Sequence, residues 1–478
     1  MVRSRQTSTA LPPDARNLSD RSAGVVMSAD TQRDRATPDA VDARLPISKL
    51  GIYGFQHVLA FFAGGAIIIP IIVASAIGLS DDELVHLINA ALLTCGVATL
   101  LQSVGIWKIG VRLPLLQGIA FAGVAPMIAI AMAAGGGAHG LRTVYGAIIV
   151  CGIATFALAP LFGKMARYFP PVVTGTVLTI IGLALLPEAA NAAVGGSGDA
   201  MDPSSTKNLL YALGTLAFIV LARRLFKGFI ATVAVLLAMV LGTVVAALIG
   251  DTDFQAVGDA AVFGMAVPFQ FGAPIFSPSA ILTMMLVIVI TAIETTGAVF
   301  AVSGIVERKP KAEDITRAMR ADGLSVAFGG VFNSFPYTCF AENVGLVRLT
   351  GVKSRWVIAA AGVIMILLGM FPKLAALVLA IPSPVLGGAS LAMFAMVAVV
   401  GIEILGGVDF KDHRNSMIVA GSLGIAMYVT AQPDVKEAVP TWMADLLGSG
   451  ITIGALTAIV LNLAFHHWTG RRKTSIPA

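Results

Sequence analysis

Apolar stretches of about 20 residues recur along the chain from Gly51 to His466 and alternate with short polar loops. Each stretch is long enough for a helix to cross a hydrocarbon core roughly 30 Å thick. The composition agrees with this pattern, because 57% of the 478 residues are hydrophobic and only 12% are charged. The sequence therefore predicts an all-α polytopic membrane protein embedded in a lipid bilayer.

Lys and Arg gather in alternate loops, which the positive-inside rule places in the cytoplasm. The basic loops are 108–112, 164–167, 223–227, 308–320, 348–355, 411–414 and 471–473. The loops between them are acidic or neutral. With both termini in the cytoplasm, we expect 14 segments, beginning near residues 51, 86, 113, 142, 170, 208, 229, 279, 320, 331, 354, 383, 414 and 447. The net charge of +5 does not indicate a nucleic-acid partner, since the basic residues are spread over these loops.

Two segments, the third and the tenth, carry proline and glycine at positions where an uninterrupted helix would not. They are residues 112–126 and 330–345, and they occupy matching places in two halves of seven segments. An odd number of segments per half gives the halves opposite topology, and matching interrupted segments point to a transport site near the membrane midplane. We expect residues 331–340 to be extended. A half-helix should begin near Glu342 and Asn343, with its N–H groups directed into a cavity.

Glu294 is the main candidate for chemistry, because it lies near the middle of the apolar run 281–306. Inserting an ionisable group at bilayer depth costs about 2.5 to 3.5 kcal/mol of free energy. Such a group usually faces a cavity, where it binds a ligand or relays a proton. The alternative is a structural ion pair or a bond to the backbone. Glu342 would accept hydrogen bonds from a ligand, or would only cap its helix. Two carboxylates in one pocket would engage a flat heterocycle, and one of them would carry a proton.

Four further polar residues are candidates for organising the site. Gln56 and His57 lie in the first segment, which we expect to end near Pro70, and His57 would either organise the site or relay protons. Asp322 would flank a helix start at the cytoplasmic interface or take part in coupling. Asn343 would tie the broken backbone or organise the site.

The remaining polar features do not indicate an enzyme, a metal or another cofactor. Cys95, Cys151 and Cys339 lie in apolar segments without metal-ligand spacing, so we expect them to pack in the core. Residues 1–46 are polar and are expected to form a disordered cytoplasmic tail, within which Met27 could equally be the start.

Four motifs together resemble the nucleobase-ascorbate transporter family, also called nucleobase:cation symporter 2. The segment 342–351, ENVGLVRLTG, fits the family signature of Gln, Glu or Pro, then Asn, one residue, Gly, four residues and Thr. It is supported by Gln56-His57, by 294–297 (ETTG) and by 332–338 (FNSFPYT). The resemblance runs from about Gly51 to Phe465.

This resemblance implies two inverted seven-span repeats, a homodimer and symport of a base with protons. It implies a core domain of residues 47–168 and 278–371 and a gate domain of 169–277 and 372–467. Residues 468–478 would form a cytoplasmic tail at the other end of the chain from residues 1–46. It also implies roles for individual residues. Glu294 and Glu342 would bind the base, Phe121 and Ala341 would donate backbone N–H groups, Phe340 and Gly64 would pack on the ring, and His57 and Asp322 would support binding or coupling.

Within the family, the amino-acid sequences of segments 170–177 and 332–338 are most similar to those of bacterial xanthine and uric acid permeases. Two positions depart from that pattern. Ala298 stands where purine members usually have Asp and uracil members His, and Glu342 stands where purine members usually have Gln. We therefore expect proton-coupled uptake of a purine such as xanthine or uric acid across the cytoplasmic membrane. A uracil symporter is the alternative, and an anion exchanger of the same architecture is a third possibility.

Overall fold

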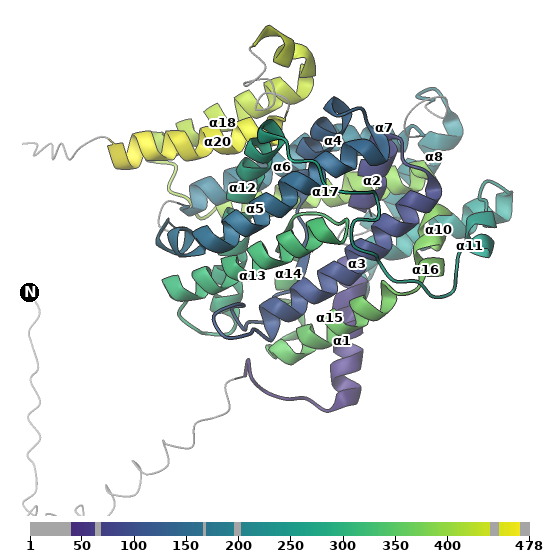
Figure 1. Ribbon diagram of the computed structural model, residues 1–478, viewed down its shortest axis with the longest axis horizontal. Helices are drawn as coiled ribbons and strands as arrows, with labels where there is room; N and C mark the ends of the chain where they lie inside the picture. The colour runs from purple at the N-terminus through teal and green to yellow at the C-terminus, as the bar shows by residue number, and fades with distance from the viewer. Residues whose placement is uncertain (1–39, 63–67, 166–168, 196–201, 440–448, 469–478) are drawn as a thin grey trace, which may run out of the picture. The chain divides into compact units, whose positions relative to one another are not determined.

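The computed structural model describes residues 40–62, 68–165, 169–195, 202–439 and 449–468 (Figure 1). The helices of the first half are α1 (Ile47–Phe61), α2 (Ile68–Ile77), α3 (Asp81–Ser103), η2 (Phe121–Gly123), α4 (Val124–Ala133), α5 (Gly137–Met165), α6 (Pro171–Ala184), α7 (Leu186–Ala193), α8 (Thr206–Leu225), α9 (Phe229–Thr232) and α10 (Ala234–Ile249). Those that follow are α11 (Gln255–Asp259), α12 (Pro278–Ile305), α13 (Ala312–Val331), α14 (Ala341–Thr350), α15 (Arg355–Leu368), α16 (Pro372–Leu379), α17 (Ser383–Leu405), α18 (His413–Ala431), η5 (Pro433–Ala438), α20 (Gly450–Asn462) and η6 (Leu463–Trp468).

Seven helices in the described ranges are long and apolar enough to cross a membrane, and the bent pair α15 and α16 makes an eighth. This pair turns by 81° at its break. Shorter apolar helices, among them α2 and α10, accompany these spans. The prediction of an all-α polytopic membrane protein is confirmed, whereas the number of 14 crossings stays a prediction.

The two predicted interruptions are short strands that pair with each other. Strand β1 (Gln117–Ile119) runs antiparallel to β2 (Tyr337–Cys339), with Gln117 opposite Cys339. Two more backbone bonds lengthen the pair: the Ala120 amide donates to the Pro336 carbonyl over 2.9 Å, and the Phe340 amide donates to the Leu116 carbonyl over 2.9 Å. Backbone without helical hydrogen bonds is thereby satisfied within the protein, as membrane depth requires.

The expected boundaries of two segments were wrong. The first crossing does not end near Pro70, because Pro70 lies in the first turn of α2, where a missing N–H is tolerated, and α2 continues to Ile77. The ninth segment does not begin near residue 320, because α13 begins at Ala312. Its charged start is stabilised locally, since the Asp314 carboxylate accepts from the Lys311 amide over 2.9 Å.

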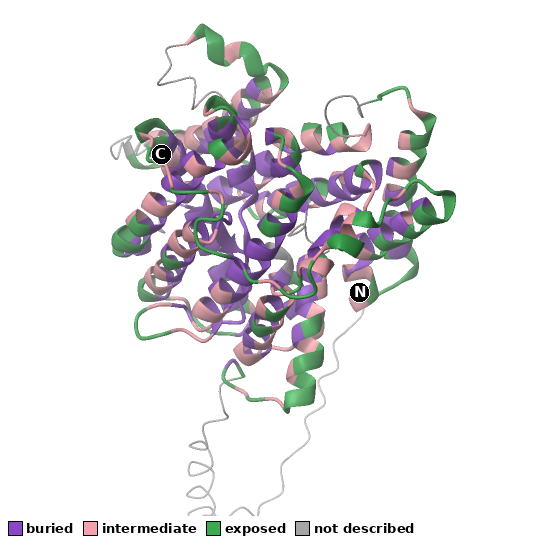
Figure 2. Cartoon of the chain, turned by 45° about the vertical axis from the view of Figure 1, so that its right-hand side comes forward, coloured by how far each residue is buried: buried purple, intermediate pink, exposed green. Residues whose placement is uncertain are grey.

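The described helices pack in two sets. α13 packs on α5 and α3, and α15 packs on α3 and α1, as Figure 1 shows. In the other set, α17 packs on α6, α7, α8 and α10, while α18 and α20 pack on each other and on α6. Buried residues line these contacts and exposed ones face outward (Figure 2). The outward residues include large apolar side chains such as Leu210 and Leu248, as expected for contact with lipid. The division into core and gate domains stays a prediction.

The contact between α5 and α13 depends on glycine. A Cβ atom at Gly152 would lie 2.3 Å from the Ala327 backbone nitrogen, and one at Gly323 would lie 2.4 Å from the Phe156 backbone nitrogen. Small residues let membrane helices approach this closely. We expect Gly152→Ala to lower the free energy of unfolding by about 1–3 kcal/mol, because backbone must shift to admit the methyl group.

Thermal melting of the purified protein in detergent tests this expectation. Gly214→Ala on α8 is the matched control, because a Cβ atom there meets nothing within 4 Å. Equal melting temperatures for the two variants would contradict the close approach of α5 and α13.

Candidate functional site

A cavity of about 550 Å³ lies where the two strand–helix breaks meet α6, α12 and α17. Its size suits a small molecule. The lining residues are Ile119, Phe121, Thr174, Leu178, Ile181, Glu294, Gly297, Ala298, Ala301, Thr338, Cys339, Phe340, Val344, Gly345, Arg348, Val397, Val400, Glu403 and Ile404. The predicted site residues Glu294, Phe121 and Phe340 are therefore brought together.

Each strand leads into a helix start beside this cavity. η2 begins at Phe121, directly after β1, and α14 begins at Ala341, directly after β2. The first N–H groups of a helix have no partner within the helix, and the dipole makes that end positive. Because β1 and β2 are antiparallel, the two helix starts lie at opposite ends of the strand pair, and Phe121 and Phe340 line the cavity from these two ends. Main-chain donors are thus available to a polar ligand from two sides.

Two aromatic rings give the cavity an apolar surface. Phe121 and Phe340 are both buried and line it. The Phe121 ring packs edge-on against Phe394, with ring centroids 5.6 Å apart, and the Phe340 ring packs edge-on against Phe61, with centroids 5.2 Å apart. These contacts hold the rings in place for packing on a flat ligand.

Because Gly118 has no side chain, the Phe340 ring can lie close to β1. A Cβ atom at Gly118 would lie 2.4 Å from Cδ2 of Phe340, so a side chain there would displace the ring. We expect Gly118→Ala to raise the KM for the substrate about tenfold, a loss of about 1.4 kcal/mol of binding free energy.

Initial uptake rates at several substrate concentrations measure this effect. Gly123→Ala is the control on the same segment, because its Cβ atom would make only ordinary contacts, the nearest at 3.4 Å to Pro336. An unchanged KM in Gly118→Ala would show that the position of the Phe340 ring does not matter for binding.

The charged residues of the cavity come from three helices. Glu294 on α12 is half-buried, and Ala298, one helical turn further on, is buried and lines the same wall. Arg348 on α14 and Glu403 on α17 also line the cavity. The sequence reasoning missed Arg348 and Glu403 as cavity residues, because charges near a membrane surface are usual and Arg348 was assigned to a cytoplasmic loop.

Three predicted ligand-binding groups fall wholly or partly outside the described residues. Gly64 lies in 63–67, which the structure does not describe. Ala341 and Glu342 are the first two residues of α14, but their side chains are not described. The backbone alone places them at the helix start beside the cavity.

Asn343 on α14 and His57 on α1 are not among the described residues that line the cavity. The Asn343 side chain is buried and donates to the Pro114 carbonyl over 2.9 Å, which ties α14 to the segment before β1. The buried His57 ring interacts with Asn343, although its Nδ1 forms no regular hydrogen bond with the described residues. Neither His57 nor the half-buried Gln56 is among the described residues that line the cavity.

The expectation that Asp322 flanks a helix start was wrong, because α13 begins at Ala312 and buries Asp322 inside the bundle. Its Oδ1 accepts from Nε2 of Gln117 over 2.8 Å and from Nε2 of Gln102 over 3.2 Å. Its Oδ2 accepts from the Thr295 hydroxyl over 2.6 Å. A buried carboxylate needs such donors, since burying it without them is costly. Thr295 follows Glu294 directly, so the network lies against the cavity wall.

Sequence reasoning missed Gln102, Gln117 and Thr295. The signal was present, because amide side chains within apolar segments usually bond across helices. Their common partner in Asp322 was invisible, since it joins positions 205 and 220 residues apart. The cysteines are buried and free as expected, and the described residues contain no group of three or more His, Cys, Asp and Glu that could hold a metal.

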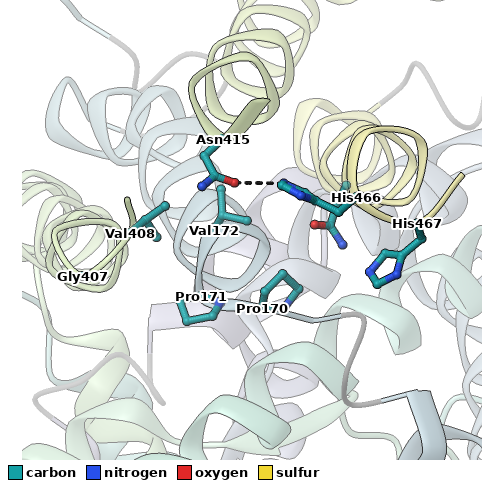
Figure 3. A pocket seen from close by; sticks show the side chains of 9 residues that line it. Pro170, Pro171, Val172, Gly407, Val408, Asn415, His466 and His467 are labelled. Atoms are coloured by element: carbon teal, nitrogen blue, oxygen red, sulfur yellow. Dashed lines mark hydrogen bonds between the residues drawn. The ribbon is translucent and has the colours of Figure 1, made fainter. Parts of the chain in front are cut away.

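One further cavity adjoins the site, and another lies apart from it. One of about 570 Å³ adjoins the first, with which it shares Leu178, Gly345, Val397, Val400 and Glu403, and it extends to Arg223 and Gly228. The other, of about 300 Å³, lies between the start of α6 and the ends of α17 and α20. Figure 3 shows His466 there, with its Nε2 3.1 Å from Oδ1 of Asn415. No residue of β1 or β2 lines it.

Solved structures share the fold at low sequence identity. The murine Solute Carrier 26 family member A9 anion transporter in the inward-facing state matches with a TM-score of 0.57 and 14% identity, over 86% of this chain and 68% of that one. The transmembrane domain of the cyanobacterium bicarbonate transporter BicA matches with a TM-score of 0.52 and 16% identity, over 85% and 97%. Identities this low establish the fold alone.

The chain thus has the inverted-repeat fold of these transporters, and the family match makes it a permease and not an enzyme. A family model described as the Permease family matches residues 48–435, and the chain belongs to that family. The resemblance to the nucleobase-ascorbate transporters is thereby confirmed.

Curated relatives match over most of their length. A xanthine permease of Bacillus subtilis is 44% identical over 88% of this chain and 94% of its own. The nucleobase transporter PlUacP of Paenibacillus larvae is 43% identical over 89% and 96%. The uric acid transporter UacT of Escherichia coli is 43% identical over 91% and 89%.

Proposed function

We propose that the protein takes up a purine nucleobase, xanthine or uric acid, together with protons across the cytoplasmic membrane. The observation that carries the proposal is the cavity of about 550 Å³, where Glu294, two aromatic rings and two helix starts surround a space of ligand size. The names of the relatives supply the substrate class, because permeases for xanthine and for uric acid both match at more than 40% identity.

Each group of the cavity has a role in this proposal. The ring of the base packs against Phe121 and Phe340, and its carbonyl oxygens accept from the backbone N–H groups of Phe121 and Ala341. Glu294 and Glu342 accept from its N–H groups. Asp322 serves coupling, while His57 and Asn343 hold α14 in place.

Alternating access would move the base between the two sides of the membrane, with the set around α17 as gate and the set around α13 as core. The adjoining cavity extends toward Arg223 and Gly228, next to a loop predicted to be cytoplasmic. We therefore assign the structure to an inward-facing state. Cytoplasmic termini and a homodimer belong to the same proposal.

Uracil is the second candidate; Glu342 favours it, and Ala298 weakens the case for a purine. Glu342 is the choice typical of uracil permeases, and Ala298 removes the Asp that purine members usually carry. The chain as a whole is 41–44% identical to a xanthine permease and two uric acid permeases, and this overall similarity favours the purine.

Competition in cells that express the full chain tests the function. Labelled xanthine is offered with unlabelled xanthine, uric acid, uracil or ascorbate, with and without a protonophore. We expect xanthine and uric acid to compete and the protonophore to stop accumulation. Competition by uracil alone would overturn the purine assignment. Uptake that ignores the protonophore but requires sodium would overturn proton coupling.

A further inference from the structure

A buried amide lies between the Asp322 carboxylate and the strand that leads to the cavity. Gln117 is fully buried on β1, and its Nε2 lies 2.8 Å from Oδ1 of Asp322 and 3.4 Å from Sγ of Cys339. Phe121 follows on the same segment and lines the cavity, whereas Gln117 does not. Gln117 therefore connects the carboxylate to the cavity wall without reaching the substrate.

The other end of this amide is unused. Oε1 of Gln117 is buried and accepts no hydrogen bond from any described residue. Buried acceptors are rarely left in this condition, because losing water without a replacement is costly. Gln102 differs, since its Nε2 donates to Asp322 and its Oε1 accepts from the Val111 amide over 3.1 Å. Gln102 is held at both ends, and Gln117 at one.

An amide with a spare oxygen suits a carboxyl group that changes its protonation state. An ionised carboxylate only accepts hydrogen bonds, whereas a neutral carboxyl group must also donate its proton. Nε2 of Gln117 now serves the ionised form. A half-turn of the amide would exchange its two ends, and Oε1 would then accept the proton of neutral Asp322. Nitrogen and oxygen are of similar size, so the turn needs no repacking.

None of the described partners of Asp322 is a Lys or Arg whose positive charge would keep the carboxyl group ionised. The elements packed against it contribute Gln102 from α3, Gln117 from β1, Thr295 from α12, next to Glu294, and the thiol of Cys339 from β2. α5 contributes Cys151, whose thiol donates to a carbonyl of α12. Uncharged donors alone hold the carboxylate, which leaves its protonation free to change.

We propose that Gln117 is a positioning residue that follows the protonation of Asp322 and transmits it along β1 to Phe121. The inference rests on the proton coupling proposed above and assigns that coupling a route. Turning the amide changes its bond to Cys339, the β2 residue paired with Gln117. Protonation of Asp322 thereby reaches both strands, and with them both helix starts at the cavity.

The test compares xanthine uptake by Gln117→Leu and wild type over a range of external pH. Leu fills a similar volume and removes both ends of the amide. We expect the maximal rate to fall about tenfold and the pH profile to be displaced from that of wild type, because Asp322 loses one of its three donors. KM should change less than about twofold, since Gln117 does not touch the substrate.

Thr99→Val is the matched control. The Thr99 hydroxyl accepts from the Gln117 backbone amide over 3.0 Å, so its loss disturbs the same residue but spares the bond to Asp322. We expect this variant to keep the wild-type pH profile. An unchanged profile in Gln117→Leu, or the same displacement in Thr99→Val, would overturn the inference while leaving the proposed function intact.

A second readout does not need transport. The melting temperature of the purified protein, followed against pH, should change its pH dependence in Gln117→Leu but not in Thr99→Val. In an Asp322→Asn background, adding Gln117→Leu should leave the pH dependence of the melting temperature unchanged. Identical pH dependence in wild type and Gln117→Leu would overturn the inference even if xanthine proved not to be the substrate.

Discussion

Glu294→Gln is expected to reduce uptake of the purine by about a hundredfold or more. The carboxylate would accept two charge-assisted hydrogen bonds from the base, each contributing about 1.5–3 kcal/mol, and an amide replaces at least one of them by a mismatched donor. Initial rates of labelled xanthine uptake, normalised to the amount of protein in the membrane, measure the loss. Binding to the purified protein should weaken in parallel.

Glu403→Gln is the matched control for this substitution, because Glu403 lines the same cavity from α17 but is exposed, whereas Glu294 is half-buried. We expect it to change uptake less than about threefold, as exposed charges contribute little. Near-normal uptake by Glu294→Gln would remove the central element of the site. Equal losses in both variants would mean that the net charge of the cavity matters and not the position of Glu294.

Glu342→Gln is expected to abolish proton-driven uptake, and Glu342→Gln combined with Ala298→Asp is expected to restore part of it. The reason is that Ala298 lacks the carboxylate that purine members usually carry there as Asp, whereas Glu342 would supply one at a position where they usually have Gln. Ala298 lines the cavity one turn beyond Glu294, so an Asp there would face the same space. We expect the single variant to lose at least about a hundredfold in rate, as removal of a positioned proton-transfer group typically costs about 10²–10⁴-fold.

Accumulation of labelled xanthine with and without a protonophore distinguishes the variants. Ala298→Asp alone is the control for steric effects of the new side chain. If the double variant is inserted in the membrane and binds xanthine but does not accumulate it, the two positions do not compensate. Coupling would then run through Glu294 and Asp322, and Glu342 would only tune which form of the ligand binds.

The fold relatives show why function has to be argued from the cavity. A bicarbonate transporter and an anion transporter share this fold at 14–16% identity. In this chain the pair of helix starts adjoins Glu294 and two aromatic rings. A carboxylate beside the ligand disfavours a small anion and favours a neutral ring with N–H groups, so the side chains at the breaks distinguish the proposed purine carrier from its fold relatives.

The sequence by itself determined the membrane-spanning class, the two interrupted segments, the family and the position of Glu294. These features are local, because a bilayer demands long apolar runs, and proline, glycine or a carboxylate within such a run is visible without a partner. Even the start of α14 beside Asn343 was predictable from residues 330–345.

The tertiary structure decided which polar groups meet. Sequence reasoning left Asp322 either beside a helix start or in a coupling role, yet it lies inside α13 and accepts from Gln117, 205 residues away. The pairing of β1 with β2 and the seat of the Phe340 ring over Gly118 likewise join distant parts of the chain. Hydropathy predicts which segments lie in the membrane, but it carries no information about which segment lies beside which. These contacts therefore follow only from the packing of the two halves.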